Sequence, residues 1–305
     1  MEFGKVPSDT LHDIEFSLPA DAPETSRVLS QAPAGKPEVY VGCAKWGRKD
    51  WVGSIYPKGT KEADFLKHYG KHFNSIELNA TFYRIPKKTQ TKSWKDNVGP
   101  GFKFCPKFSD KISHLKRFND VGKLTEIFLD GISGFEEKLG PALLMPHPGM
   151  GPKSLETLDN YLQSLPKDLK VFVELRNPKW FSDPAAFDQV SLMLERNKAG
   201  SVITDSAGRR DCVHMRLTTP TAFIRFVGNG LHPTDYTRVD QWVARIREWI
   251  AQGIHAVYFF MHQQEEIHSP ALCKYAIEQL NEKCGTTLTV PEFVEGSEPV
   301  RTPGK

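Results

Sequence analysis

Charged residues occur inside segments of this sequence that otherwise read as buried β-strands. In Lys170–Arg176, Glu174 and Arg176 alternate with apolar residues, and Glu77 alternates in the same way within Ser75–Tyr83. A strand covered on both faces should be almost wholly apolar, so charges spaced by two residues need an explanation. They either pair with one another or form a functional site.

Further charges lie in or at the ends of other strand-like segments, namely Lys107, Asp205, Arg225 and His262. Because parallel strands end at one edge, these side chains would meet at the carboxyl ends of the strands, where barrel enzymes carry their chemistry. We therefore predict a functional site at that end. The structural alternative is a set of ion pairs, such as Glu77 with Lys107 and Glu174 with Arg225, that seals the barrel.

This mixture of charges suits acid–base chemistry on an anionic substrate. Two carboxylates in different environments act as general acid and base, a histidine titrates near neutral pH, and cations clamp a carboxylate or phosphate. The predicted catalytic residues are Glu77, His114, Glu174 and Asp205, and the predicted substrate-binding residues are Trp46, Asn79, Tyr83, Lys107, Arg176, Trp180 and Arg225. The aromatic residues among them either stack on the ligand or pack against their own helices.

Short β-rich segments alternate with longer helical ones along most of the chain. The predicted strands are Glu38–Trp46, Ser75–Tyr83, Phe102–Phe108, Pro141–Pro146, Lys170–Arg176, Gly200–Asp205, Thr221–Val227 and Ala256–His262. The predicted helices are Glu62–Phe73, Lys88–Asn97, Val121–Lys138, Ser154–Leu165, Pro184–Arg196, Asp235–Gln252 and Pro270–Lys283. Ala207–Pro220 has no clear amphipathic helix.

This alternation implies parallel strands joined by helical crossovers, and eight such units in about 250 residues suit a closed (β/α)8 TIM barrel. An open doubly wound sheet is the second possibility. Gly42–Gly47 lacks the GxGxxG spacing of a dinucleotide-binding turn, and the sequence has no GxxxxGK[ST] phosphate loop. We expect a single barrel domain over residues 37–290, with an irregular N-terminal extension (1–36) and a polar C-terminal tail (291–305).

The barrel segment also resembles the YecE-like family, known as domain of unknown function 72, from about Val41 to about Leu280. The matching pieces are Gly42 to Trp46, Asp50-Trp51, Tyr56 to Gly59, Ile76 to Pro86, His114 with Arg117, Lys138 to Pro141, Glu174 to Arg176 with Trp180, Asp205-Ser206 and Arg225. The resemblance implies a TIM barrel with a pocket built from Glu77, Asn79, Lys107, His114, Glu174, Arg176, Asp205 and Arg225. It implies no reaction, because the family has none assigned.

The sequence departs from the family pattern at positions around the expected pocket. They are Lys45 for a common Gly, Met145 for a Gln, Asn177 and Val227 for His residues, and Met261-His262-Gln263 for an Asn-rich strand end. These departures indicate a divergent subgroup with its own substrate or activity.

Composition narrows the class of protein. The 305 residues are 39% hydrophobic, and 40 Lys and Arg stand against 37 Asp and Glu, a net charge of +3 that gives no general attraction to polyanions. Apolar runs are far shorter than the roughly 20 residues that cross a membrane. Five scattered cysteines without a CxxC pair indicate reduced thiols. We expect a soluble, cytoplasmic protein without membrane contact.

The favoured hypothesis is a hydrolase or lyase acting on a small anionic or phosphate-bearing substrate. We expect no metal and no other cofactor, because the nearby cations would oppose a divalent ion, although Glu77, Glu174, Asp205, His114 and His262 keep a metal site open. A nucleic-acid-binding or repair-related barrel, by fold analogy with endonuclease IV, is a second hypothesis, and a ligand-binding barrel without turnover is a third. The sequence does not fix the oligomeric state.

Overall fold

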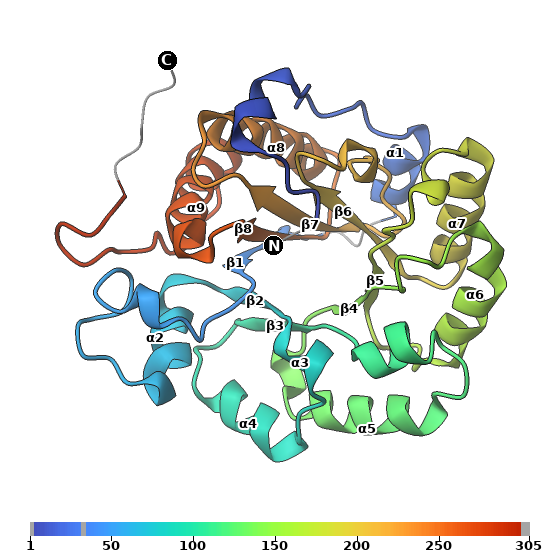
Figure 1. Cartoon of the computed structure of the whole chain (residues 1–305), viewed down its shortest axis with the longest axis horizontal. Coiled ribbons are helices and arrows are strands. Elements are labelled where there is room, and N and C mark those ends of the chain that lie inside the picture. The colour runs from blue at the N-terminus through green and yellow to red at the C-terminus, as the bar shows by residue number, and fades with distance from the viewer. Residues whose placement is uncertain (1–2, 32–34, 300–305) are drawn as a thin grey trace.

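Parallel strands lie at the centre of the molecule and helices surround them, as Figure 1 shows for the computed structural model of the chain. The structure describes residues 3–31 and 35–299. The strands are β1 (Glu38–Cys43), β2 (Ser75–Leu78), β3 (Lys103–Pro106), β4 (Ala142–Leu144), β5 (Val171–Val173), β6 (Gly200–Asp205), β7 (Thr221–Gly228) and β8 (Ala256–Gln263). The α-helices are α1 (Pro23–Leu29), α2 (Phe65–His72), α3 (Ala80–Tyr83), α4 (Lys88–Asp96), α5 (Gly122–Ser133), α6 (Leu155–Ser164), α7 (Pro184–Arg196), α8 (Pro233–Ala251) and α9 (Ser269–Cys284). No helix of this part of the chain is long and apolar enough to cross a membrane.

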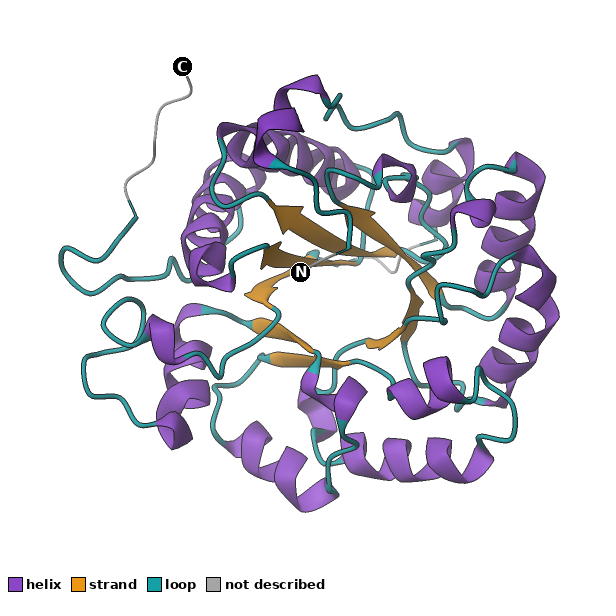
Figure 2. Cartoon of the chain, in the orientation of Figure 1, coloured by secondary structure: helices purple, strands orange, loops and turns teal. Residues whose placement is uncertain are grey.

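The strands form two parallel sheets. Six strands pair in the order β1-β8-β7-β6-β5-β4, and β2 pairs with β3. Figure 2 shows the strands curving around a common centre with the helices outside them. The predicted parallel α/β arrangement is confirmed. A sheet of eight strands closed by hydrogen bonds all the way round is not shown, because among the described residues the ladder is interrupted between β1 and β2 and between β3 and β4.

Side chains take the place of the ladder between β1 and β2. The Tyr69 hydroxyl of α2 accepts a hydrogen bond from the Cys43 N–H at 2.8 Å and donates to the Ser75 carbonyl at 2.9 Å. The Asn74 amide donates to the Val39 carbonyl and accepts from the β1 backbone. A Cβ atom on Gly42 would lie 1.9 Å from the Ser75 carbonyl oxygen. Only glycine therefore fits where these two strands approach each other.

Several predicted strands end earlier than the sequence suggested. The predicted strand Ser75–Tyr83 is wrong beyond Leu78, because the chain turns there into the short helix α3. The Thr81 hydroxyl holds this turn by hydrogen bonds to the carbonyls of Leu78 (2.9 Å) and Lys107 (2.7 Å). Lys107 and Glu174 likewise follow the last residues of β3 and β5. Glu77 thus lies next to the last residue of β2, and Lys107 and Glu174 directly follow their strands with backbone N–H groups bonded to the neighbouring strand ends.

The other predicted elements are found close to their expected positions. The predicted strand Gly200–Asp205 has the bounds of β6, and the predicted helices overlap α2 and α4 to α9. The segment between β6 and β7 contains only the 3-10 turn Arg210–Cys212, as expected from its lack of amphipathic periodicity.

The strands bury both of their faces. Inside the ring, a layer of mainly large side chains includes Tyr40, Phe172, Phe223, Tyr258 and Phe260, and Tyr40 stacks on Tyr258 with ring centroids 4.6 Å apart. A second, larger cluster fills the space between strands and helices. Because the interior layer is aromatic and packed, the charged residues at the carboxyl ends of the strands have an apolar floor beneath them.

Residues 3–31 pack along the barrel. Val28 and Leu29 of α1 join the main apolar cluster, while Leu11 and Phe16 form a small cluster with Ala207 after β6. Figure 1 shows this dark blue segment crossing the ring beside α8. Part of the sequence without helical or strand periodicity is thus fixed against the carboxyl ends of the strands.

Replacing Gly42 by Ala tests the close approach of β1 to β2. We expect Gly42→Ala to lower the free energy of unfolding by about 1–3 kcal/mol, the usual cost of overpacking, because backbone atoms stand in the way of the new methyl group. Gly47→Ala is the matched control, since no atom lies within 4 Å of its added Cβ. Urea denaturation of both variants measures the difference, and equal stabilities would contradict this account.

Candidate active site

A buried arginine connects two carboxylates at the carboxyl ends of the strands. Arg225 of β7 is fully buried, and its Nε and Nη2 donate to the two carboxylate oxygens of Glu77 at 2.7 and 2.8 Å. Its Nη1 donates to Oε1 of Glu174 at 2.5 Å. A planar guanidinium suits such a forked arrangement, and burial of a charge requires partners of this kind. One side chain therefore links β7, β2 and the end of β5.

Other side chains take up the remaining hydrogen-bonding capacity of Glu77. The amide of Asn79 donates to its Oε1 at 2.8 Å, and His262 Nε2 lies 3.0 Å from its Oε2. Burial alone would raise the pKa of Glu77, but the charge of Arg225 and the contact with His262 outweigh burial and hold this pKa well below its usual value. Glu77 is therefore ionised.

Glu174 is bonded in the same way. Arg176 donates to it through Nε and Nη2 at 3.1 and 3.0 Å, and the Thr204 hydroxyl donates at 3.0 Å. Burial alone would raise the pKa of Glu174, but the charges of Arg176 and Arg225 outweigh it and lower the pKa to about 2. An ionised carboxylate has no proton to give, so the geometry offers no support for Glu174 as a general acid.

One of the two predicted ion pairs is confirmed and the other is wrong. Glu174 does pair with Arg225. The predicted pair of Glu77 with Lys107 is wrong, because Glu77 pairs with Arg225 and His262 instead. Arg225 reaches both carboxylates from β7, on the far side of the ring from β3, which leaves Lys107 outside the network.

A cavity of about 750 Å³ lies over this network. Its inner wall includes Asn79, Lys107, His114, Arg176, Arg225 and His262, and Tyr83, which is 75% exposed, stands at its rim. Neither Glu77 nor Glu174 is among the residues that line it. The cations of the network thus face the cavity and its two carboxylates lie behind them, while three other acids, Asp50, Glu265 and Glu266, also line the cavity.

Lys107 is the buried cation of the cavity without an acidic partner. Its side chain is 6% exposed, and its Nζ lies 4.7 Å from the centroid of the Phe82 ring. Within residues 3–31 and 35–299, the ammonium has no hydrogen-bond or ion-pair partner. Burial and the nearby charge of Arg225 lower the pKa of Lys107 to about 8. A substantial fraction of neutral amine therefore exists slightly above neutral pH.

His114 lies beside the same phenylalanine. It sits in the turn Lys111–Leu115, its Nδ1 is 2.9 Å from the Ser113 hydroxyl, and its ring meets the Phe82 ring edge-on at 4.9 Å. Burial lowers the pKa of His114 to about 4, and His147 and Lys107 add to this effect. His114 is therefore a neutral imidazole near pH 7, with one nitrogen bonded to Ser113.

Five of the predicted site residues do not line this cavity: Glu77 and Glu174 lie in the network behind it, and the other three lie elsewhere. Asp205 accepts hydrogen bonds from Arg238 (2.7 Å), Trp242 (2.7 Å) and Arg210, and thereby fixes α8 to the end of β6. Trp180 is buried and donates to the Met150 carbonyl at 2.9 Å, while Trp46 packs edge-on against Trp94. The remaining predicted residues line the cavity.

Sequence reasoning missed the contribution of the N-terminal segment. The Phe3 ring lies 4.3 Å from the guanidinium of Arg176, and the Gly4 carbonyl accepts a hydrogen bond from the Gly208 N–H at 2.8 Å. A short aperiodic segment carries no signal for such a contact. Phe82, in contrast, lies within the longest of the family-like pieces, where its position could have been considered.

No group of three or more His, Cys, Asp or Glu side chains in the described ranges is arranged to hold a metal ion. The possible ligands Glu77, Glu174 and Asp205 are each bonded to arginines. The residues present therefore do not fit the metal site that the sequence kept open.

The family model of the protein of unknown function DUF72 matches residues 40–294. The chain belongs to the DUF72 family. It is 26% identical over 277 residues to the UPF0759 protein YecE of Escherichia coli K12, which covers 85% of this chain and 98% of that protein. The UPF0759 protein YunF of Bacillus subtilis 168 is 26% identical over 162 residues, 51% of this chain and 56% of that protein.

Solved structures of the family share the fold. A DUF72 protein from Thermotoga maritima MSB8 aligns with a TM-score of 0.61 and 22% identity over 80% of this chain and 99% of that one. A DUF72 protein from Enterococcus faecalis V583 aligns with a TM-score of 0.61 and 18% identity over 82% of this chain and 99% of that one. Because the family description gives no activity, the function has to be argued from the site.

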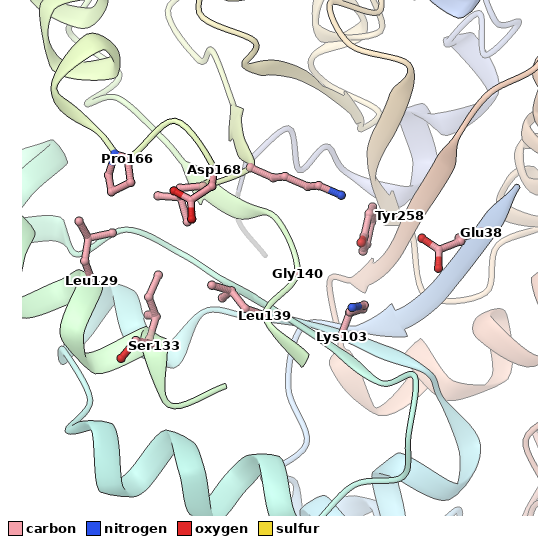
Figure 3. A pocket seen from close by; sticks show the side chains of 12 residues that line it. Glu38, Lys103, Leu129, Ser133, Leu139, Gly140, Pro166, Asp168 and Tyr258 are labelled. Atoms are coloured by element: carbon pink, nitrogen blue, oxygen red, sulfur yellow. The ribbon is translucent and has the colours of Figure 1, made fainter. Parts of the chain in front are cut away.

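A second cavity of about 340 Å³ lies at the opposite end of this DUF72 barrel. Figure 3 shows Glu38, Lys103 and Tyr258 on one side of it and Pro166 and Asp168 on the other. Its lining has two lysines, Lys103 and Lys170, against two acids, Glu38 and Asp168, so its charges balance. We therefore place the candidate active site at the carboxyl end of the strands.

Removing Arg225 tests the network. We expect Arg225→Leu to lower the free energy of unfolding by about 3–5 kcal/mol, because it leaves two buried carboxylates without their shared cation. Lys107→Met, at a buried cation without an acidic partner, should leave stability unchanged or raise it. Urea denaturation measures both variants. A larger loss for Lys107→Met than for Arg225→Leu would show that the roles are reversed.

The pH dependence of stability tests the environment of Lys107. Folding lowers the pKa of Lys107 from 10.5 to about 8, so its buried ammonium costs stability below pH 8 and this cost disappears as the pH rises from about 8 towards 10.5. Unfolding free energies measured across this range should therefore rise more, or fall less, in the wild type than in Lys107→Met. Parallel curves for the two proteins would disprove the shift.

Proposed function

We propose that this DUF72 protein is an enzyme of the hydrolase or lyase type that acts on a small anionic molecule bound in the cavity over Arg225. The observation that carries the proposal is the buried ammonium of Lys107, which borders the cavity without an acidic partner in the described residues. The cavity lining has five cations, Lys45, Arg48, Lys107, Arg176 and Arg225, and its acids are Asp50, Glu265 and Glu266 in the lining with Glu77 and Glu174 behind it, so the charges of the whole site balance. Lys107 nevertheless carries a positive charge that no acid in the described residues contacts. A bound carboxylate or phosphate would neutralise it.

The chemistry of the cavity wall supports an anion with a compact charged group. Lys107 offers a point charge, and Arg176 offers a planar guanidinium at the cavity wall whose other partner is Glu174. The aromatic layer beneath and the low exposure of these groups reduce screening by water, so the attraction is stronger than at an open surface. Asn79 and His114 border the same space and supply neutral polar groups.

The geometry also redistributes the roles that the sequence suggested. We propose that Lys107 and His114 handle protons, because both border the cavity, part of Lys107 is neutral near its lowered pKa of about 8, and the pKa of about 4 keeps His114 unprotonated at neutral pH. Glu77 and Glu174 hold Arg225 in place and keep the interior charge low. Asp205 acts at a distance, by anchoring α8. Nothing in the cavity favours nucleic acid over a small ligand.

For the organisation of the chain we propose that residues 37–290 form one barrel of the (β/α)8 type, with segments 1–36 and 291–305 added at its ends. Side-chain bridges between β1 and β2 support this, as do the isolated backbone bridges of Phe104 with Leu139 and of Lys107 with Leu143 beside β3 and β4. We further propose a cytoplasmic location, which is supported by the five cysteines that form no disulfide bond in the described residues.

Calorimetry with inorganic phosphate tests anion binding. We expect phosphate to bind the wild type and to bind Lys107→Met and Arg176→Met about tenfold more weakly, equivalent to about 1.4 kcal/mol, because each variant removes one cation from the cavity wall. Lys123→Met is the matched control, with the same charge change on the exposed face of α5. Equal binding by all four proteins would place the anion elsewhere, and absence of binding at low salt would overturn the proposal.

A further inference from the structure

We propose that Lys107 is a nucleophile that forms an imine with its substrate, and that the substrate is therefore an anionic aldehyde or ketone. This inference rests on the proposed anion-binding function, and it specifies the substrate class and favours the lyase type of reaction. It is carried by the placement of the lysine, by its missing acidic partner and by the groups around its amine.

The backbone holds Lys107 firmly at the end of β3. Its N–H donates to the Thr81 hydroxyl at 2.9 Å, and its carbonyl accepts from the same hydroxyl at 2.7 Å. The next residue, Phe108, donates its N–H to the Leu143 carbonyl at 2.9 Å. Both neighbouring strand ends therefore fix the origin of the side chain, which reaches the cavity with its Nζ over the Phe82 ring.

A comparison with another buried lysine shows what is unusual here. The Nζ of Lys138 donates to the backbone carbonyls of Lys95 and Val98 at 2.8 and 2.7 Å, which is the expected arrangement for a structural lysine. Lys107 is buried to a similar degree, yet its amine has no such acceptor in the part of the chain that the structure describes. The two carboxylates that act electrostatically on Lys107, Glu174 and Glu77, are already held by arginines. Its lone pair is free once the proton has left.

The surroundings favour the neutral amine. Burial and the adjacent Arg225 disfavour the ammonium form, which is the way in which proteins activate a lysine towards a carbonyl group. Glu174 and Glu77 act in the opposite direction and raise the pKa of Lys107, but burial and the charge of Arg225 outweigh them. Both acidic groups thus bond to Arg225, and the amine of Lys107 stays available to react.

The proposed step balances without an oxidant or reductant. The neutral Nζ attacks the carbonyl carbon, a C–N bond forms, and the carbonyl oxygen takes up a proton. Loss of water then gives the C=N bond, so that the carbonyl oxygen and the two hydrogens of the amine leave as one water molecule. Arg176 would hold the anionic group of the substrate, and the neutral imidazole of His114, on the same Phe82 ring, would accept and return the proton.

Reductive trapping tests this inference. The folded protein is incubated near pH 8 with sodium borohydride and either pyruvate or dihydroxyacetone phosphate, and the modified residue is located by peptide mass spectrometry. The two probes share a carbonyl carbon close to a negative charge and distinguish a carboxylate from a phosphate. We expect a stoichiometric adduct at Lys107 with at least one of them.

Two variants serve as comparison. Lys107→Arg keeps the positive charge and should lose the adduct, whereas Lys45→Arg removes the other lysine of the cavity lining and should keep it. Mapping of the wild type alone still decides the question if Lys107→Arg does not fold. An adduct at Lys45, or labelling spread over many lysines, would overturn the inference.

The failure of this inference is distinguishable from that of the proposed function. Phosphate binding that depends on Lys107, together with no adduct from either probe, would overturn the imine and leave the anion-binding site in place. If phosphate does not bind and neither probe gives an adduct, both this inference and the proposed function are overturned.

Discussion

The rest of this site depends on the ion pairs of the Arg225 guanidinium. It is buried between two carboxylates that come from β2 and the end of β5, and every one of its nitrogens has a partner at 2.5 to 3.3 Å. A buried ion pair of this kind adds little net stability compared with apolar packing, although breaking it is costly. Its retention at the mouth of a barrel therefore points to a role in specifying the site.

The network also determines the surroundings of Lys107. Glu77 and Glu174 are bonded to Arg225, Arg176 and His262, and the buried cation Lys107 faces a cavity above a layer of packed aromatic rings. A charge held above an apolar floor is poorly screened, which is why we propose this cavity as the binding place of a small anion or a reactive carbonyl compound. The Phe3 ring of the N-terminal segment packs against the guanidinium of Arg176.

Much of this arrangement could be predicted from the sequence, for a physical reason. Buried strands and amphipathic helices repeat their apolar residues with different periods, so the sequence predicts their alternation. Charged residues at the ends of apolar strands are unusual, and the sequence therefore indicates them as well. The partners of those charges could not be read in the same way. Whether Glu77 meets Lys107 or Arg225 depends on the angle at which each strand end enters the ring. Asp205 is held by Arg238 and Trp242, which lie 33 and 37 residues further along the chain on α8.

The aromatic residues show the same limit. Tyr83 and Trp180 both follow predicted strands, yet Tyr83 is 75% exposed at the cavity rim and Trp180 is buried with its indole bonded to Met150. Local sequence does not separate these outcomes, because each is decided by the helix or loop that packs on the strand from elsewhere.

The most direct test of the central claim is a high-resolution crystal structure of the protein soaked in phosphate. The account predicts an anion within hydrogen-bond distance of Lys107 Nζ and Arg176, with Arg225 still bonded to both Glu77 and Glu174. A cavity without the anion, or carboxylates of Glu77 and Glu174 turned towards it with Lys107 paired to one of them, would contradict the account.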